Sequence, residues 1–126
     1  MVFEAVGAPL SLPADANAIN IARFVTLAAT GISESGGGTD EVVGVSMEAV
    51  AAGNDGLAVP CARPIGCKVE VTAGAAVAAG ALVMSDATGR AITATATNKI
   101  HGQALTAAAA AGEVITILFF KGANVA

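Results

Sequence analysis

The two halves of this chain match each other when one is shifted along the sequence by about 58 positions. Ala29-Thr30-Gly31 falls on Ala87-Thr88-Gly89, and Gly44 falls on Gly102. The same shift pairs apolar positions: Val25 with Val83, Val42 with Ile100, Met47 with Leu105, Leu57 with Ile115 and Val59 with Ile117. We therefore expect a pseudo-repeat over residues 22–61 and 80–119. Shared alanine-rich composition is the alternative explanation.

The last part of the chain carries the clearest strand pattern. Glu113 to Phe120 is dense in β-branched and aromatic residues, which favour a pleated, half-buried surface. Ile100 to Leu105 is expected to be a second short strand. The segment between them, Ala107 to Gly112, begins with five alanines, too few to form an isolated stable helix, so it predicts a turn.

The rest of the chain also predicts strands rather than helices. The expected strands are Ile19 to Ala28, Glu41 to Met47, Leu57 to Cys61, Cys67 to Val71 and Ile92 to Asn98. Cys67 to Val71 alternates clearly, with Lys68 and Glu70 facing outward. Ala29 to Thr39 is expected to be a loop, in which Ser33 to Gly38 is exposed and mobile. The fold class expected is all-β, a small barrel or sandwich formed by one domain over residues 19–126.

Small side chains limit how much this fold can be stabilised from within. Hydrophobic residues make up 55% of the 126 residues, but many are alanine, there is no Trp or Tyr, and only four Phe are present. Such a core buries little apolar area for each residue that it orders. We therefore expect a protein that is marginally stable alone and gains stability from a partner subunit.

Charge excludes two broad classes of partner. The formal net charge is −4, and the six basic residues are scattered, whereas nucleic-acid binding needs a clustered basic surface. A membrane partner is not expected either, because the uncharged stretch Val71 to Ser85 is short and rich in Gly and Ala. The N-terminal residues do not resemble a secretory signal, so we expect a protein made in the cytosol.

Chemistry-bearing residues are too few for an enzyme or a metal site. His101 is the only histidine, and the adjacent carboxylates Asp40 and Glu41 are interpreted as a solvated face at a loop end. Cys61 and Cys67 have a spacing that suits a small disulfide loop or two metal ligands, but two further ligands are missing. We favour two free, partly buried cysteines in adjacent strands, and we expect no cofactor, no metal and no small-molecule substrate.

Residues 1–18 predict an extended N-terminal arm. Pro9 and Pro13 remove backbone donors and favour extended geometry, and the segment carries isolated apolar residues at Phe3, Val6, Leu10 and Leu12. Such a segment cannot bury its apolar side chains on itself, so we expect it to lie on a partner. The candidate partner-binding residues are Val2, Phe3, Val6, Leu10, Leu12 and Pro13. The alternative is an ordinary first strand folded onto its own domain.

Two family resemblances involve the second half. The glycine rhythm of Val69 to Ala91 resembles the hammerhead strands of biotinyl and lipoyl carrier domains, but Val83 to Asp86 lacks the acceptor lysine that those domains present. The segment from His101-Gly102-Gln103-Ala104-Leu105 through the alanine-rich turn to Glu113-Val114-Ile115-Thr116-Ile117 resembles the end of small tailed-phage capsid decoration proteins, also called cement proteins. This second resemblance covers residues 65–121.

The cement-protein resemblance implies a structural virion protein. It implies a small β domain on the outer face of an icosahedral capsid, assembled in the host cytoplasm, often as a homotrimer. The implied partner is the major capsid protein, whose neighbouring subunits it ties together. Two alternatives stay open: a subunit of another assembly, such as a tail, fibre or surface layer, and a small carrier or ligand-binding β domain.

Overall fold

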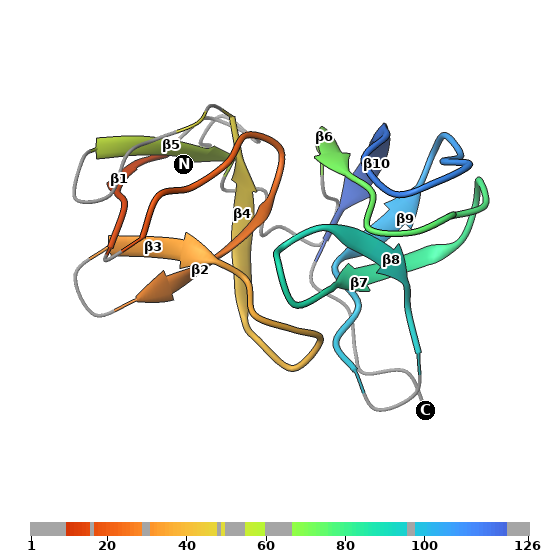
Figure 1. The fold of residues 1–126 in the computed structure, drawn as a ribbon, viewed down its shortest axis with the longest axis horizontal. Coiled ribbons are helices and arrows are strands. Elements are labelled where there is room, and N and C mark those ends of the chain that lie inside the picture. The colour runs from red at the N-terminus through yellow and green to blue at the C-terminus, as the bar shows by residue number, and fades with distance from the viewer. Residues whose placement is uncertain are drawn as a thin grey trace, which may run out of the picture.

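A computed structural model describes residues 10–15, 17–28, 31–47, 49, 55–59, 67–95 and 98–120 (Figure 1). These residues contain ten β-strands and no helix, which confirms the all-β class. The strands are β1 Leu10–Pro13, β2 Phe24–Ala28, β3 Gly31–Glu34, β4 Val42–Ser46, β5 Asp55–Val59, β6 Cys67–Thr72, β7 Leu82–Ser85, β8 Ala91–Thr93, β9 Gly102–Ala104 and β10 Val114–Phe119.

The strands form two antiparallel five-stranded sheets with the same internal order. The first sheet has the order β1-β5-β4-β2-β3, and the second has the order β6-β10-β9-β7-β8. Each strand of the first sheet therefore has a counterpart five strands later. The register agrees where β2 meets β4 and β7 meets β9: Phe24 opposes Val45, as Leu82 opposes Gln103 about 58 positions later. This order is compatible with the pseudo-repeat expected from the sequence, which stays a prediction.

Each sheet curls until its two edge strands meet. A parallel bridge joins Ala14 to Ile32 in the first half, and an equivalent bridge joins Ala73 to Ala91 in the second. Each bridge is accompanied by a backbone hydrogen bond of 2.8 Å, from the Asp15 amide to the Ile32 carbonyl or from the Gly74 amide to the Ala91 carbonyl. The result is two small barrels side by side, called here the first barrel (β1–β5) and the second barrel (β6–β10) (Figure 1). Closure protects sheet edges that would otherwise be free to pair with other chains.

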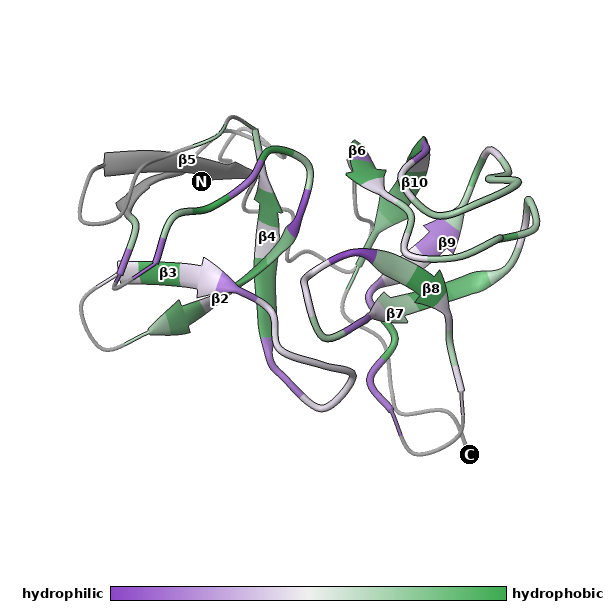
Figure 2. Cartoon of the chain, in the orientation of Figure 1, coloured by the Kyte–Doolittle hydropathy of each residue, from purple (hydrophilic) through white to green (hydrophobic). Residues whose placement is uncertain are grey.

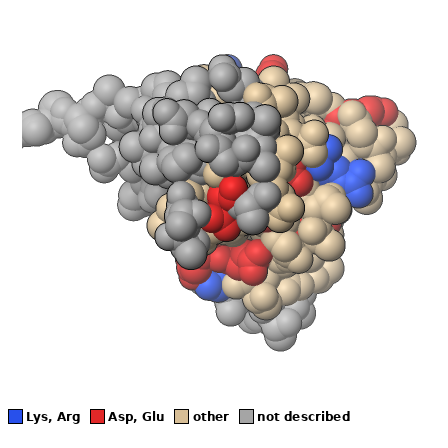
Figure 3. Space-filling view, turned by 60° about the vertical axis from the view of Figure 1, so that its left-hand side comes forward, with Lys and Arg blue, Asp and Glu red and all other residues tan. Residues whose placement is uncertain are grey.

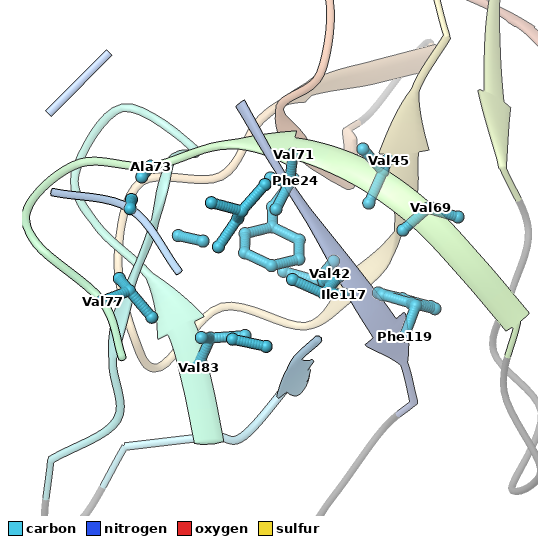
Figure 4. Close-up of a cluster of buried hydrophobic side chains, with 14 residues drawn as sticks. Phe24, Val42, Val45, Val69, Val71, Ala73, Val77, Val83, Ile117 and Phe119 are labelled. Carbon is cyan, nitrogen blue, oxygen red and sulfur yellow. The ribbon is translucent and has the colours of Figure 1, made fainter. Parts of the chain in front are cut away.

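One hydrophobic cluster spans both barrels. Most of its members point into the second barrel, but Phe24, Val42 and Val45 come from the first (Figure 4). A separate cluster inside the first barrel contains Ala14, Ile19, Val25 and Ile32. Figure 2 shows β4, which lies between the barrels, as largely hydrophobic along its length. Because the larger core is shared, each barrel helps to stabilise the other.

The alternation predicted for the second barrel is confirmed. On β10, the side chains of Ile115, Ile117 and Phe119 are buried. On β6, Val69 and Val71 are buried, whereas Lys68 and Glu70 are exposed. The expected turn after β9 is also present, and of the strand expected at Ile92 to Asn98 only the beginning is found, in the edge strand β8 at Ala91–Thr93.

The loop predicted over Ala29 to Thr39 is wrong at Gly31–Glu34, and the exposure predicted for Ser33 to Gly38 is wrong at Ser35. Residues Gly31–Glu34 form β3, which pairs antiparallel with β2, and Ile32 is fully buried. Ser35 is only 1% exposed, and its amide donates a 2.8 Å hydrogen bond to the Phe24 carbonyl. Ile32 is the only large apolar residue of this strand, so the sequence shows no strand pattern there. The strand expected at Leu57 to Cys61 lies earlier, at Asp55–Val59.

The described part of the expected arm lies on its own chain. Leu10–Pro13 form β1, which pairs with β5 from Leu10 opposite Ala58 to Pro13 opposite Asp55. The next residue, Ala14, is 2% exposed and belongs to the core of the first barrel. Here the apolar segment adds to a sheet edge of its own chain rather than of a neighbour. Residues 1–9 and Cys61 lie outside the described residues.

Candidate interaction surfaces

The junction between the barrels is built around Phe24. Its ring centroid lies 5.5 Å from that of His101 and 6.4 Å from that of Phe119, both in a tilted arrangement. Figure 4 shows Phe24 and Phe119 among the other buried side chains of this core. Backbone bonds fix the approach: the Phe24 amide donates to the Gly89 carbonyl at 2.7 Å, and the Thr72 amide donates to the Ala22 carbonyl at 2.8 Å. Aromatic contacts of this kind add to the stabilisation from burial. The junction is therefore a fixed part of the fold rather than a hinge.

The β7–β8 turn supplies the second-barrel side of this junction. Gly89 has φ +80°, and a Cβ atom there would lie 2.8 Å from the Phe24 carbonyl oxygen. A side chain is therefore excluded both by the left-handed backbone and by the first barrel. The Arg23 guanidinium donates to the neighbouring Thr88 carbonyl at 3.1 Å, which adds a polar contact across the junction.

Asp86 holds this turn in shape. Its Oδ1 accepts hydrogen bonds from the Thr88 amide at 2.8 Å, the Thr88 hydroxyl at 3.1 Å and the Arg90 amide at 2.9 Å. Its Oδ2 accepts from the Arg90 Nε at 3.1 Å. Partial burial alone would raise the pKa of Asp86, but the hydrogen bonds from Arg90 and Thr88 and the nearby guanidinium charge outweigh it and hold the pKa below its ordinary value.

A second contact joins equivalent loops of the two halves. The Lys99 amide donates to the Gly38 carbonyl at 2.7 Å, and the Lys99 ammonium pairs with the Glu41 carboxylate. Glu41 and Lys99 occupy matching positions in the pseudo-repeat. An ion pair this close to solvent contributes little by itself, so we assign it the role of aligning the two loops.

An uncharged surface covers one end of the second barrel. It consists of residues 73–81 and 105–112, called here the alanine cap. The two segments are tied together by reciprocal hydrogen bonds between Val77 and Ala108, of 3.0 and 2.9 Å, and by the Gly112 amide to the Ala73 carbonyl at 2.8 Å. The exposed alanines of the cap are Ala75, Ala76, Ala78, Ala79, Ala107, Ala109, Ala110 and Ala111.

The alanine cap suits contact with a protein surface. No residue of its two segments is charged, but the exposed Glu113 carboxylate at its border accepts a 3.0 Å hydrogen bond from the Ala109 amide. Leu105 within the cap and Val114 beside it are 44% and 56% exposed. Alanine loses no side-chain rotamer entropy when it is covered, and the backbone of the cap is already fixed by hydrogen bonds. Large exposed apolar surfaces of this kind mark interaction sites in soluble proteins.

On the described part of the face drawn in Figure 3, charged side chains stand in small groups. Lys and Arg stand there in small groups among uncharged surface, with Asp and Glu close to them. Among the residues that the structure describes, no group of three or more His, Cys, Asp or Glu is placed to hold a metal ion. The same residues include no helix that is long and apolar enough to cross a membrane.

A shallow depression lies on the outer face of β6 and β10. It has a volume of about 260 Å³ and is lined by Lys68, Val69, Glu70 and Thr116. Small-molecule sites are normally larger, enclosed and mostly apolar. This depression gives no support to the ligand-binding alternative.

The residues predicted to bind a partner are only partly placed. Val2, Phe3 and Val6 lie outside the described residues, whereas Leu10, Leu12 and Pro13 form β1. The sequence interpretation treated the alanine runs only as turns and so missed the cap. The signal that was present is two uncharged alanine-rich segments, each joining strands of the same barrel.

Comparison with known proteins decides the family. The sequence profile described as phage cement protein matches residues 5–119, which is most of the chain. The chain belongs to the phage cement protein family. The resemblance found in the second half of the sequence is thereby confirmed and extended to the first half.

A solved structure shares the fold of this cement protein. The N base of head fiber gp8.5 from bacteriophage phi29 superposes with a TM-score of 0.69 at 17% sequence identity, covering 89% of this chain and 94% of that one. At this identity the likeness concerns the fold alone. No curated protein matched the sequence.

Proposed function

We propose that this protein binds the outer face of an icosahedral phage capsid and stabilises the contacts between neighbouring major capsid protein subunits. The observation that carries the proposal is the match to the phage cement protein family over residues 5–119. The role is structural rather than enzymatic, and the protein joins the virion during assembly in the host cytoplasm. It acts as a homotrimer.

Two parts of the chain are assigned to the capsid contact. The first is the N-terminal segment, with Val2, Phe3, Val6, Leu10, Leu12 and Pro13 as the contacting residues. The second is the alanine cap, because it is uncharged, exposed and already ordered by its backbone hydrogen bonds. A rigid apolar surface loses little entropy on binding, which suits a protein that clamps a shell already built.

The fold likeness to a head fiber base favours one alternative. That structure is described as the N base of a head fiber, so the alternative is a domain at the base of a fibre rather than a cement protein. Mass spectrometry of purified particles separates the two, since only a fibre base co-purifies with a fibre partner in a fixed ratio.

Binding to capsid shells that lack this protein tests the main proposal. Shells assembled without this protein should bind it at near-stoichiometric ratio to the major capsid protein and should then resist heat and low ionic strength better. The double variant Ala109→Glu/Ala110→Glu should weaken binding by at least tenfold, because it places two charges on the alanine cap. Thr93→Glu, on an exposed position of β8, is the matched control. Shells that bind none of the wild-type protein would refute the proposal.

A further inference from the structure

The strand correspondence between the barrels reveals a face that is covered in one barrel and bare in the other. Phe24 on β2 opposes Val45 on β4, and Leu82 on β7 opposes Gln103 on β9 in the same register. Phe24 is 0% exposed because the second barrel covers it, whereas Leu82 is 41% exposed. The same position therefore carries a large apolar side chain in both halves, but only one of them is covered.

The backbone around the two positions also agrees. Ala22, two residues before Phe24, has φ +59°, and Gly80, two residues before Leu82, has φ +89°. A left-handed conformation thus occurs at both matching places, although only Ala22 adopts it without being a glycine. The two faces therefore match in strand register and in the backbone that leads into them.

The bare face is apolar and ordered. It is called here the Leu82 face and consists of Leu82, Ile100 and Gln103, the counterparts of Phe24, Val42 and Val45. Ile100 and Gln103 are each half-buried, and the Gln103 amide donates to the Gly80 carbonyl at 3.0 Å, which ties its polar end to its own barrel. Residues 71–85 include no charged side chain.

We propose that the Leu82 face binds the first barrel of a second copy of this chain. The contact inside the chain shows the manner of binding: Ala22 and Phe24 on one barrel meet Thr72 and Gly89 on the other, so two different surfaces are joined. Such a head-to-tail contact repeats from copy to copy and gives a ring or a fibre. The counterpart of His101 in the first barrel is Val43, which is partly exposed. In the proposed contact, Val43 of the second copy would meet Leu82 as His101 meets Phe24 within the chain.

This inference goes beyond capsid attachment and supplies the surface for self-association. A ring of three chains joined in this way is the homotrimer of the proposed function. Within the chain, the occupant of the equivalent face is a barrel of the same fold, which is why a second copy is assigned here rather than the shell. The two assignments are tested separately, one in solution and one on particles.

Sedimentation equilibrium of the full chain tests the inference. The wild-type protein should self-associate in the micromolar range, and Leu82→Glu should weaken the association by at least tenfold. Val114→Glu is the matched control, because Val114 is 56% exposed on β10, outside both the Leu82 face and the first barrel that would receive it, and it should associate like the wild type. Circular dichroism melting checks that each variant is folded. If Leu82→Glu fails to fold, the milder Leu82→Ser replaces it with the same expectation.

Three results would overturn the inference. The first is a wild-type chain that stays monomeric at all concentrations, and the second is an oligomer that stays intact in a folded Leu82 variant. The third is a monomeric protein in which the Leu82 substitution weakens only the binding to shells, which would assign the face to the capsid. A wild-type oligomer that Leu82→Glu dissociates, but that does not bind shells, would support the inference while refuting the proposed function.

Discussion

Phe24 joins two folding units that the chain order keeps apart. It belongs to a strand of the first barrel, yet its ring fills the core of the second among Val71, Ile117 and Phe119. In a core made largely of valine and alanine, one phenylalanine supplies an unusually large share of the buried apolar area. Its loss leaves a cavity that small, backbone-fixed neighbours cannot fill.

Phe24→Ala is therefore expected to lower the free energy of unfolding by about 3–5 kcal/mol. Leu27→Ala, on the same strand but 65% exposed, is the control and should change it by less than about 1 kcal/mol. Urea unfolding followed by circular dichroism measures both. Equal effects of the two variants would mean that the barrels do not share a core in solution.

Gly89 allows the separate contribution of the junction to be measured. Gly89→Ala should destabilise the protein by about 1–2 kcal/mol through its left-handed backbone and by more through contact with the Phe24 carbonyl. Gly112 has a similar φ of +93° but open space around it, so Gly112→Ala should show the backbone cost alone. The difference between the two variants in the free energy of unfolding, measured by thermal unfolding, gives the contribution of the close contact at the junction. A Gly112→Ala effect as large as that of Gly89→Ala would contradict the close approach.

At the scale of elements, the β7–β8 turn depends on one carboxylate. Because the pKa of Asp86 is lowered in the folded state, its ionised form stabilises the fold above the ordinary pKa of an aspartate, near 4. This stabilisation is lost as the pH falls through the lower, folded-state pKa. The turn should therefore weaken in acid and stay intact at neutral pH.

Asp86→Asn tests the turn through its pH dependence. At pH 7 the substitution should lower the free energy of unfolding by about 1–2 kcal/mol, since hydrogen bonds to a charged acceptor are replaced by weaker ones. The difference from the wild type should shrink as the pH is lowered below about 4. Glu70→Gln, an exposed carboxylate on β6, should have little effect at either pH. A difference that persists unchanged at pH 2 would exclude the ionised carboxylate as the cause.

Strand prediction from sequence succeeded where side chains alternate and failed where one residue carries the strand. Val69 and Val71 against Lys68 and Glu70 reveal β6 at once, because inner and outer faces differ in polarity. In β3 Ile32 is the only buried apolar residue. The strand is defined by its pairing with β2, which a local sequence pattern does not predict. Alternation identifies the two faces of a strand, but it does not say that the outward face of β2 will be covered by another barrel.

On the scale of the whole molecule, the sequence revealed the shift of about 58 residues, and the structure shows its consequence in space. Two equivalent barrels side by side do not meet through equivalent surfaces, apart from the loops at Glu41 and Lys99. One half must therefore leave exposed a face whose counterpart in the other half is covered. The alanine-rich composition predicts that the protein depends on a partner subunit, and this stays a prediction; the face proposed to bind that partner could be argued only from the three-dimensional arrangement.

The N-terminal segment was interpreted from the sequence as an arm, and Leu10, Leu12 and Pro13 show why the interpretation was incomplete. Spaced apolar residues in an extended, proline-containing segment suit an arm and an edge strand equally, since both add to a free sheet edge. The choice depends on whether such an edge exists in the same chain. Here β5 supplies it, so β1 and Ala14 help to close the first barrel.

Two truncations separate the stabilising and the binding parts of this segment. Removal of residues 2–14 should lower the melting temperature by 10 °C or more, because it deletes β1 and opens the Ala14–Ile32 bridge. Removal of residues 2–9 should leave the melting temperature within a few degrees of the wild type. The shorter truncation should nevertheless weaken binding to capsid shells by at least tenfold, since it deletes Val2, Phe3 and Val6, which are proposed to contact the shell. Calorimetry and co-sedimentation with shells measure the two effects independently. Full shell binding without residues 2–9 would move the capsid contact away from the N-terminus and leave the alanine cap as the assigned surface.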